Sequence, residues 1–213
     1  ALDSATFSIK PQEFVCGLGP SGSGKTSVGS RIASEVDLML VDSGLLYRVF
    51  TAAYVDQFPS DRCVQHDRLA GILERCISYE VGGTVLFDGQ VLGLSLQDPK
   101  VERLVSPVSA VPEVRAAVNR ELRRIAALHD VVMVGRDIGT TVLPNALLKV
   151  FITADPDVRA KRRVVQLERL GAPVDYEAVL SNIRERDAID SSREDSPLRC
   201  TEDYVKLDNS ADG

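Results

Sequence analysis

Short apolar runs alternate with longer amphipathic segments along most of this chain. The apolar runs, which are typical of strands buried on both faces of a sheet, cover residues 13–18, 38–41, 131–134, 147–152 and 204–207. The longer segments carry apolar residues at helical spacing and cover residues 25–36, 45–55, 67–77, 112–128, 156–170 and 176–189. Strands that alternate with helices predict an α/β fold, with a parallel sheet core flanked by helices and wound by right-handed crossovers.

Residues 61–100 interrupt this alternation. After the helical segment at 67–77, two short β-rich runs at 79–81 and 84–87 are bracketed by Gly82-Gly83 and Asp88-Gly89. Such turn pairs between β-rich runs indicate a hairpin. We therefore expect a small α+β insert within a single domain that spans residues 1–213, a length that suits one hydrophobic core.

The composition of the chain indicates in which cellular compartment the protein works. No stretch approaches the roughly 18 to 20 consecutive apolar residues that would span a bilayer, and residues 1–12 have neither the basic nor the apolar region of a signal peptide. The four cysteines are scattered without CxxC spacing, which argues against a zinc site and a disulfide framework. These features predict a cytoplasmic protein with no membrane partner.

The charge of the chain is uneven. A net charge of −6 argues against a nucleic-acid partner, because such a surface must neutralise several phosphates. One quarter of the chain is nevertheless rich in basic residues: Arg159, Lys161, Arg162, Arg163, Arg169, Arg184, Arg186, Arg193 and Arg199. This gathering predicts a site for phosphorylated small molecules; the alternative is a solvated helix face.

A phosphate-binding loop follows the first apolar run. Residues 19–26 read Gly19-Pro20-Ser21-Gly22-Ser23-Gly24-Lys25-Thr26 and match GxxxxGK[ST] in full, between a predicted strand and a predicted helix. In such loops the backbone N–H groups and the helix N-terminus surround phosphate oxygens. We expect residues 19–27, Ser27 included, to bind ATP, with Lys25 on the β- and γ-phosphates and Thr26 on Mg²⁺.

The same loop also fits a second pattern. Residues 17–22 satisfy GxGxxG, and Asp42 follows about twenty residues later at the end of a strand. That is the fingerprint of dinucleotide-binding proteins, so a nicotinamide-dependent oxidoreductase is an alternative from another class. GxGxxG is the looser pattern, however, and a dinucleotide site needs neither Gly24-Lys25-Thr26 nor a downstream arginine cluster.

Four further segments make the comparison with a known family specific. Residues 41–48 (VDSGLLYR), 106–115 (SPVSAVPEVR), 135–140 (GRDIGT) and 186–198 (RDAIDSSREDSPL) resemble, in order, segments of the bacterial cytidylate kinases, the CMP/dCMP kinases among the P-loop nucleoside monophosphate kinases. The resemblance covers about residues 13 to 209. It implies that residues 61–100 bind the nucleoside monophosphate and that residues 156–195 form a helical lid.

The resemblance also assigns roles to arginines. It implies that Arg48, Arg136 and Arg193, together with Lys25, act in catalysis by holding the acceptor phosphate and the migrating phosphoryl group. Guanidinium groups suit this role because they donate in bidentate fashion and stay charged. Ser43 would add a hydroxyl to the acceptor phosphate.

The segment that begins at Arg186 has helical spacing of its charges. Arg186, Asp190 and Arg193 follow i, i+4, i+7 and so lie on one face of a helix. The resemblance implies that Arg186 and Asp190 meet the sugar hydroxyls of the acceptor. The alternative is a surface ion pair of little energetic weight.

By resemblance, Ser106, Arg115 and Asp137 surround the acceptor base. Cytosine offers an N4 amino donor where uracil offers an O4 acceptor, so a carboxylate favours cytosine. Asp137 is therefore predicted to read N4. Its alternatives are an ion pair with Arg136 and a position near Mg²⁺.

These features predict an enzyme that transfers the γ-phosphoryl group of ATP to CMP or dCMP, with Mg²⁺ as cofactor, as a monomer. A kinase for UMP, AMP or a non-nucleotide acceptor is the alternative in the same class. A nucleotide-binding protein without turnover is the other, since Leu18 stands where the family usually has aspartate. Gln97 stands where the family tends to carry arginine in the insert.

Overall fold

The structure, a computed structural model, describes residues 15–73, 75, 77–79, 84–91, 96, 98–169, 171, 174–192 and 196–211. The chain divides into two compact units. Residues 1–38 and 131–213 form the first unit, and residues 39–130 form the second. Within the described residues, no helix is both long and apolar enough to cross a membrane.

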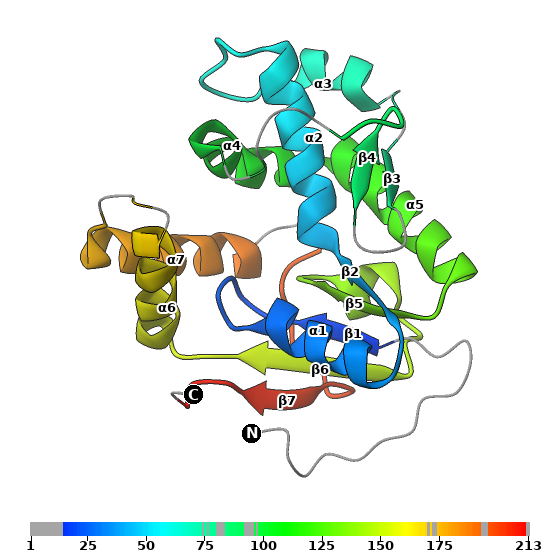
Figure 1. Cartoon of the computed structure of the whole chain (residues 1–213), viewed down its shortest axis with the longest axis vertical. Helices are drawn as coiled ribbons and strands as arrows, with labels where there is room; N and C mark the ends of the chain where they lie inside the picture. The colour runs from blue at the N-terminus through cyan, green and yellow to red at the C-terminus, as the bar shows by residue number, and fades with distance from the viewer. Residues whose placement is uncertain are drawn as a thin grey trace. The chain divides into compact units, whose positions relative to one another are not determined.

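The first unit supplies four of the five strands of the main sheet (Figure 1). These strands are β1 (Val15–Leu18), β5 (Val131–Gly135), β6 (Leu148–Thr153) and β7 (Val205–Asp208). They lie in the order β5-β1-β6-β7 and every pairing between them is parallel. All residues of β5 are buried, which explains its continuous apolar run. The predicted α/β class with a parallel sheet is confirmed.

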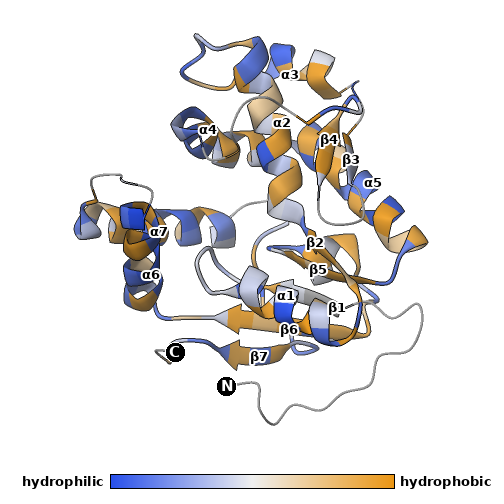
Figure 2. Ribbon diagram, in the orientation of Figure 1, coloured by the Kyte–Doolittle hydropathy of each residue, from blue (hydrophilic) through white to orange (hydrophobic). Residues whose placement is uncertain are grey.

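The first unit also contains helices, of which α1 packs on this sheet. They are α1 (Lys25–Glu35), α6 (Pro156–Arg169) and α7 (Tyr176–Ser192), with one π-helical turn, η1 (Ile138–Val142). Helix α1 packs on β5 and buries Ile32 and Ala33. Helices α6 and α7 pack on each other around Ala160, Leu180 and Ile183. Figure 2 shows β6 in the orange of hydrophobic residues.

The second unit consists of helices around a short hairpin. Its elements are β2 (Met39–Asp42), α2 (Ser43–Gln57), α3 (His66–Leu73), β3 (Ile77–Tyr79), β4 (Val85–Phe87), α4 (Pro99–Ala110) and α5 (Pro112–Leu128). Helix α2 packs against α4, α5 and β4, and is buried along most of its length because it is apolar on several faces. Strands β3 and β4 are antiparallel, with Ile77 opposite Phe87.

Most predicted elements are confirmed to within a few residues, and α5 has the predicted bounds. The helix predicted over residues 67–77 is wrong at its end: α3 stops at Leu73, and Ile77 already belongs to β3. Helix α4 and the turn η1 were not predicted. Of the predicted strand at 79–81, only Tyr79 lies within the described residues, as does only the second turn pair, Asp88-Gly89. The boundaries of the insert (61–100) and the lid (156–195) remain predictions.

Candidate active site

The phosphate-binding loop joins β1 to α1 in a conformation that requires glycine. Gly22 and Gly24 have φ angles of 78° and 86°, in the region that side chains other than glycine rarely adopt. A Cβ atom on Gly19 would collide with the backbone carbonyl oxygen of Ile152. The loop therefore passes so close to β6 that only glycine fits there, as a loop built to wrap phosphate oxygens requires.

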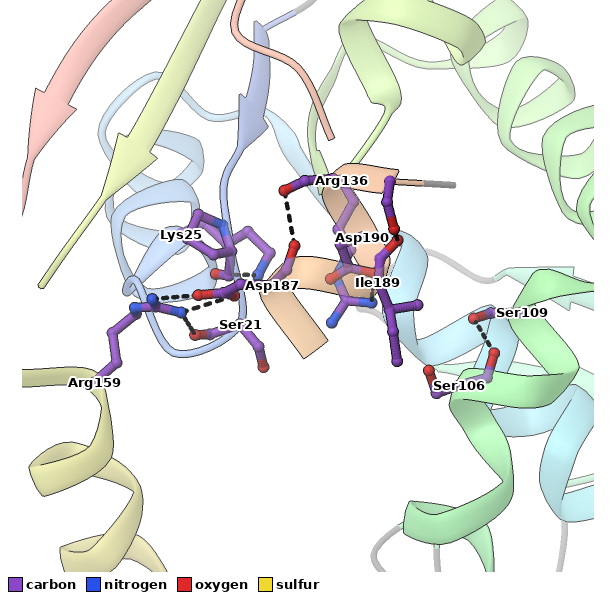
Figure 3. A network of polar contacts seen from close by, with 12 residues as sticks. Ser21, Lys25, Ser106, Ser109, Arg136, Arg159, Asp187, Ile189 and Asp190 are labelled. Atoms are coloured by element: carbon purple, nitrogen blue, oxygen red, sulfur yellow. Dashed lines mark hydrogen bonds and ion pairs between the residues drawn. The ribbon is translucent and has the colours of Figure 1, made fainter. Parts of the chain in front are cut away.

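Three backbone carbonyl groups of this loop accept hydrogen bonds from side chains. Lys25 Nζ donates to the oxygen of Pro20 at 3.2 Å, Arg159 Nη1 to that of Ser21 at 3.2 Å, and Asn209 Nδ2 to that of Ser23 at 2.9 Å (Figure 3 shows the first two). Side chains from α1, from α6 and from the residue after β7 thus support the loop.

One hydroxyl of the loop is buried without a partner. Ser23 is fully buried, and its Oγ makes no hydrogen bond in the structure. A buried hydroxyl without a partner is costly, and a ligand oxygen within the loop would satisfy it. Thr26 and Ser27, in the first turn of α1, are exposed residues.

Leu18 ends β1 and is completely buried. The side chain therefore belongs to the hydrophobic core of the first unit. An aspartate at this position would be buried as a charge, which is expensive unless the charge is paired. Gln97, the second departure from the resembled family, lies outside the described residues.

Arg136 and Asp137 follow β5 directly, where parallel strands of an α/β sheet place their ligand-binding ends. Asp137 is buried, with 4% of its surface exposed. Its carbonyl oxygen accepts from Val142 N at 3.4 Å, and Leu143 N donates to Ile138 O at 2.7 Å. Both bonds follow the i→i+5 pattern of the π-helical turn η1. Such turns occur frequently at functional sites.

Helix α7 supplies a carboxylate to Arg136. Asp190 accepts from Arg136 Nη1 through Oδ1 at 3.0 Å, and Oδ2 lies 2.9 Å from Nε, so the pair is bidentate (Figure 3). Burial lowers the pKa of the Arg136 guanidinium, Asp190 opposes this shift, and the nearby charge of Arg186 adds to it. Arg136 still stays charged near neutral pH.

Two guanidinium groups thus influence each other around one buried carboxylate, an arrangement that an anion would stabilise. Arg186 and Asp190 both lie on α7, as their spacing predicted. Arg193, the third residue of that spacing, lies outside the described residues. The ion-pair partner of Arg136 is Asp190 and not Asp137, which was the alternative role considered for Asp137.

In the second unit, Ser43 and Arg48 lie on α2. Asp42 caps this helix by accepting from Gly44 N at 2.9 Å, and Ser43 is buried. Arg48 donates through Nη1 to the Leu96 carbonyl oxygen at 3.0 Å, and its Nη2 lies 3.1 Å from Oε1 of Glu102. The arginine predicted to bind phosphate is therefore held by a carboxylate of its own unit.

The segment with the other predicted base contacts spans the end of α4 and the start of α5. Ser109 Oγ donates to the Ser106 carbonyl oxygen at 2.9 Å (Figure 3), and Arg115 Nη1 donates to the Ser109 carbonyl oxygen at 3.3 Å. Arg115 is 3% exposed. The structure thus brings Ser106 and Arg115 together through Ser109.

Four residues that contact predicted site residues within their own unit were not themselves predicted. Arg159 and Asp187 form a bidentate ion pair next to the loop, Asn209 contacts the loop, and Glu102 holds Arg48. Arg159 belongs to the basic quarter of the sequence, and Asp187 adjoins Arg186 in the lid segment. Asn209 and Glu102 carry no sequence signal that we can identify.

The sequence matches known proteins over nearly its full length. The family model described as cytidylate kinase matches residues 18–213. A cytidylate kinase of Parabacteroides distasonis is 38% identical over 199 residues, which are 90% of this chain and 87% of that protein. A cytidylate kinase of Rhodococcus jostii is 38% identical over 195 residues, covering 90% and 85% of the two chains.

Solved structures support the fold alone. An uncharacterised protein from Eubacterium ventriosum superposes with a TM-score of 0.50 at 16% identity and covers 93% of this chain and 89% of that one. At such low identity the similarity concerns only the arrangement of the elements.

Proposed function

Because the chain belongs to the cytidylate kinase family, we propose that it transfers the γ-phosphoryl group of ATP to CMP or dCMP, giving ADP and CDP or dCDP. The observation that carries this proposal is the phosphate-binding loop, in which close approach to β6 and positive φ angles demand glycine. This loop occurs within a chain that matches the family model from residue 18 onward.

ATP binds to the loop through its phosphates. The N–H groups of the loop and the N-terminus of α1 surround the β- and γ-phosphates, and the unpartnered Ser23 hydroxyl accepts or donates one further hydrogen bond. Lys25, which donates to the Pro20 carbonyl oxygen, turns to the phosphates as charge accumulates there. The loop thus supplies positioning and positive charge.

Magnesium fits this site with few protein ligands. No group of three or more His, Cys, Asp or Glu residues that could hold a metal exists among the described residues, and Mg²⁺ commonly keeps several waters and binds substrate phosphates. The hydroxyl of Thr26, an exposed residue in the first turn of α1, is the protein ligand that we assign. When bound, Mg²⁺ neutralises developing charge on the phosphates.

The acceptor phosphate binds arginine. Arg48, Arg136 and Arg193 provide the guanidinium groups, and Ser43 adds a hydroxyl donor. A phosphate group can accept bidentate hydrogen bonds from each arginine, which compensates the repulsion between two anionic substrates. Arg186 and Asp190 on α7 bind the sugar hydroxyls.

The acceptor base binds Asp137, Ser106 and Arg115. A buried carboxylate such as Asp137 accepts from the N4 amino group of cytosine and repels the O4 oxygen of uracil. Sites that pair a polar substrate group reject analogues strongly, because the wrong analogue leaves buried groups unpaired. We assign residues 61–100 to acceptor binding and residues 156–195 to a lid that excludes water.

The test is a coupled assay of ADP release with Mg²⁺ and ATP against CMP, dCMP, UMP, AMP and no acceptor. We expect strong turnover with CMP and dCMP and little with the others. Turnover only with another acceptor would leave the kinase class and overturn the base assignment. ATP binding without turnover for any acceptor would overturn the enzymatic function.

The substitution Asp137→Asn tests base reading separately. An amide can donate to the O4 oxygen of uracil, so the ratio of CMP to UMP turnover should fall by at least about tenfold. An unchanged ratio would remove Asp137 from the base site.

A further inference from the structure

Arg159, on α6, is a buried cation with three different acceptors. Its side chain is 3% exposed. Nε donates to the Ala154 carbonyl oxygen at 2.9 Å, just after β6, and Nη1 donates to the Ser21 carbonyl oxygen of the phosphate-binding loop at 3.2 Å. Nη1 also donates to Oδ1 of Asp187 on α7 at 3.0 Å, while Nη2 pairs with Oδ2 (Figure 3).

The geometry makes this guanidinium a rigid connection. The planar fork of arginine donates in fixed directions, so a shift of one acceptor must be followed by the others or break a charge-assisted bond. The Cβ and Cγ atoms of Arg159 also lie against Gly22, within 4 Å of the position that a Cβ atom would occupy. Arg159 therefore contacts the loop through both its stem and its head.

The far end of this connection is the helix to which we assign acceptor binding. Asp187 lies one residue from Arg186 and three residues from Asp190, whose carboxylate pairs with Arg136. Two ion pairs thus attach the same part of α7: Asp190 joins it to the end of β5, and Asp187 joins it to the phosphate-binding loop through Arg159.

We propose that Arg159 and Asp187 form a positioning pair that couples ATP binding at the phosphate-binding loop to acceptor binding on α7. The inference rests on the proposed function, since it takes the ligands of the loop and of α7 from it. Neither residue touches the reacting atoms. The pair acts by making the loop conformation that binds ATP favour the α7 position that binds CMP, and by thermodynamic reciprocity the reverse also holds.

Asn209 provides the matched control. It follows β7 and also holds the loop, because Nδ2 donates to the Ser23 carbonyl oxygen at 2.9 Å. Its backbone N–H donates to Thr153 and its carbonyl oxygen accepts from Arg162, so within the described residues its hydrogen bonds avoid α7. Loss of the Asn209 side chain loosens the loop and leaves the connection to α7 intact.

The experiment measures the dissociation constant of the β,γ-imido analogue of ATP with Mg²⁺, by calorimetry, in the absence and presence of saturating CMP. For the unaltered protein we expect CMP to tighten analogue binding by at least about fivefold. In Asp187→Asn, which keeps the shape of the side chain and removes its charge, this ratio should fall below about twofold. Asp187→Glu should restore part of it.

The control separates coupling from general damage. Asn209→Ala should weaken analogue binding alone and keep the ratio of the unaltered protein. A thermal unfolding curve for each variant establishes that it is folded. Arg159→Lys, which retains a cation but not the fork, should reduce the ratio and also weaken analogue binding, because it loses both contacts.

The outcomes distinguish this inference from the proposed function. If the unaltered protein turns over CMP but the ratio is about one, or if Asp187→Asn keeps the full ratio, the coupling pair is wrong and the kinase assignment stands. If CMP neither binds nor is phosphorylated while another acceptor is, the proposed acceptor fails; the same ratio measured with that acceptor then tests the pair.

Discussion

The phosphate-binding loop and Arg48 are two predicted phosphate-binding groups whose surroundings differ. The loop is fixed by the scaffold: Gly19 passes against β6, and Arg159 and Asn209 hold two of its carbonyl groups. Arg48, by contrast, is about a quarter exposed and is paired with Glu102, which is equally exposed. The loop is already shaped for an anion, whereas Arg48 is neutralised by a carboxylate.

This difference indicates where ligand binding requires a rearrangement of the protein and where it does not. A preorganised loop binds phosphate with little rearrangement, so changes to its shape should be severe. A phosphate that binds Arg48 competes with Glu102, so removal of that carboxylate should improve binding. The substitutions Gly19→Ala and Glu102→Gln test this contrast directly, and Arg136→Lys and Tyr79→Phe extend the test to two other residues; the expected effects decrease from Gly19→Ala to Tyr79→Phe.

Gly19→Ala should have the largest effect. The new Cβ atom meets the Ile152 carbonyl oxygen of the backbone, so the loop must shift, and misplacement by about 1 Å commonly costs about 100-fold in rate. We expect kcat/KM for ATP to fall by at least about 100-fold, measured by ADP release. Gly71→Ala is the matched control: it lies exposed in α3 with open space around it, and should leave activity unchanged. Equal activity of both variants would refute the idea of a closely fitted loop.

Arg136→Lys should come next. Lysine keeps the charge but cannot form the bidentate pair with Asp190 or bind phosphate oxygens in the same way. We expect kcat to fall by about 10- to 100-fold with a smaller change in the KM for ATP. Arg124→Lys, in the exposed pair of Arg124 with Glu121, should have no effect on kcat. A loss confined to KM would contradict a role of Arg136 in the transition state.

Glu102→Gln should improve acceptor binding. Partly exposed ion pairs contribute up to about 1 kcal/mol, so freeing Arg48 from its carboxylate should lower the KM for CMP by about two- to fivefold. Glu35→Gln, in the exposed pair with Arg31, controls for the change in net charge. A higher KM in Glu102→Gln would mean that the carboxylate orients Arg48 instead of competing for it.

The smallest effect concerns alkaline stability of the second unit. Burial raises the pKa of Tyr79 above its ordinary value, and its hydroxyl donates to the Leu40 carbonyl oxygen at 3.2 Å. A raised pKa contributes stability that is full below the unfolded pKa of about 10 and is lost as pH rises through the folded pKa. Tyr79→Phe should therefore flatten the decline in thermal stability above about pH 10. An unchanged decline would assign it to other groups, such as Tyr54, whose pKa burial also raises.

The sequence predicted those elements whose signals are local. Helix α5 was predicted with its full bounds, because proline at its start and one apolar face identify it. Helix α4 was not predicted, since Pro107 stands within it and proline is unfavourable in a helix interior. The end of α3 was overestimated because the apolar residues of β3 continue the helical spacing.

The residues of the candidate site also divide into those with a local sequence signal and those without one. The loop and the Arg136 segment were predictable because each motif is contiguous. The partners of these residues were not: Asp187 meets Arg159 at a separation of 28 residues, and Glu102 meets Arg48 at 54. Such pairs depend on tertiary packing, which spacing along a chain does not encode locally.

The bond from Asn209 to the Ser23 carbonyl oxygen spans 186 positions of the chain. During synthesis, the ribosome therefore releases the whole of the phosphate-binding loop long before the residue that completes its support exists. A growing chain has the loop but lacks the contacts that stiffen it. We therefore expect full affinity for a nucleotide only once β7 has joined the sheet, in which case the bound nucleotide would stabilise the completely folded chain over incomplete ones.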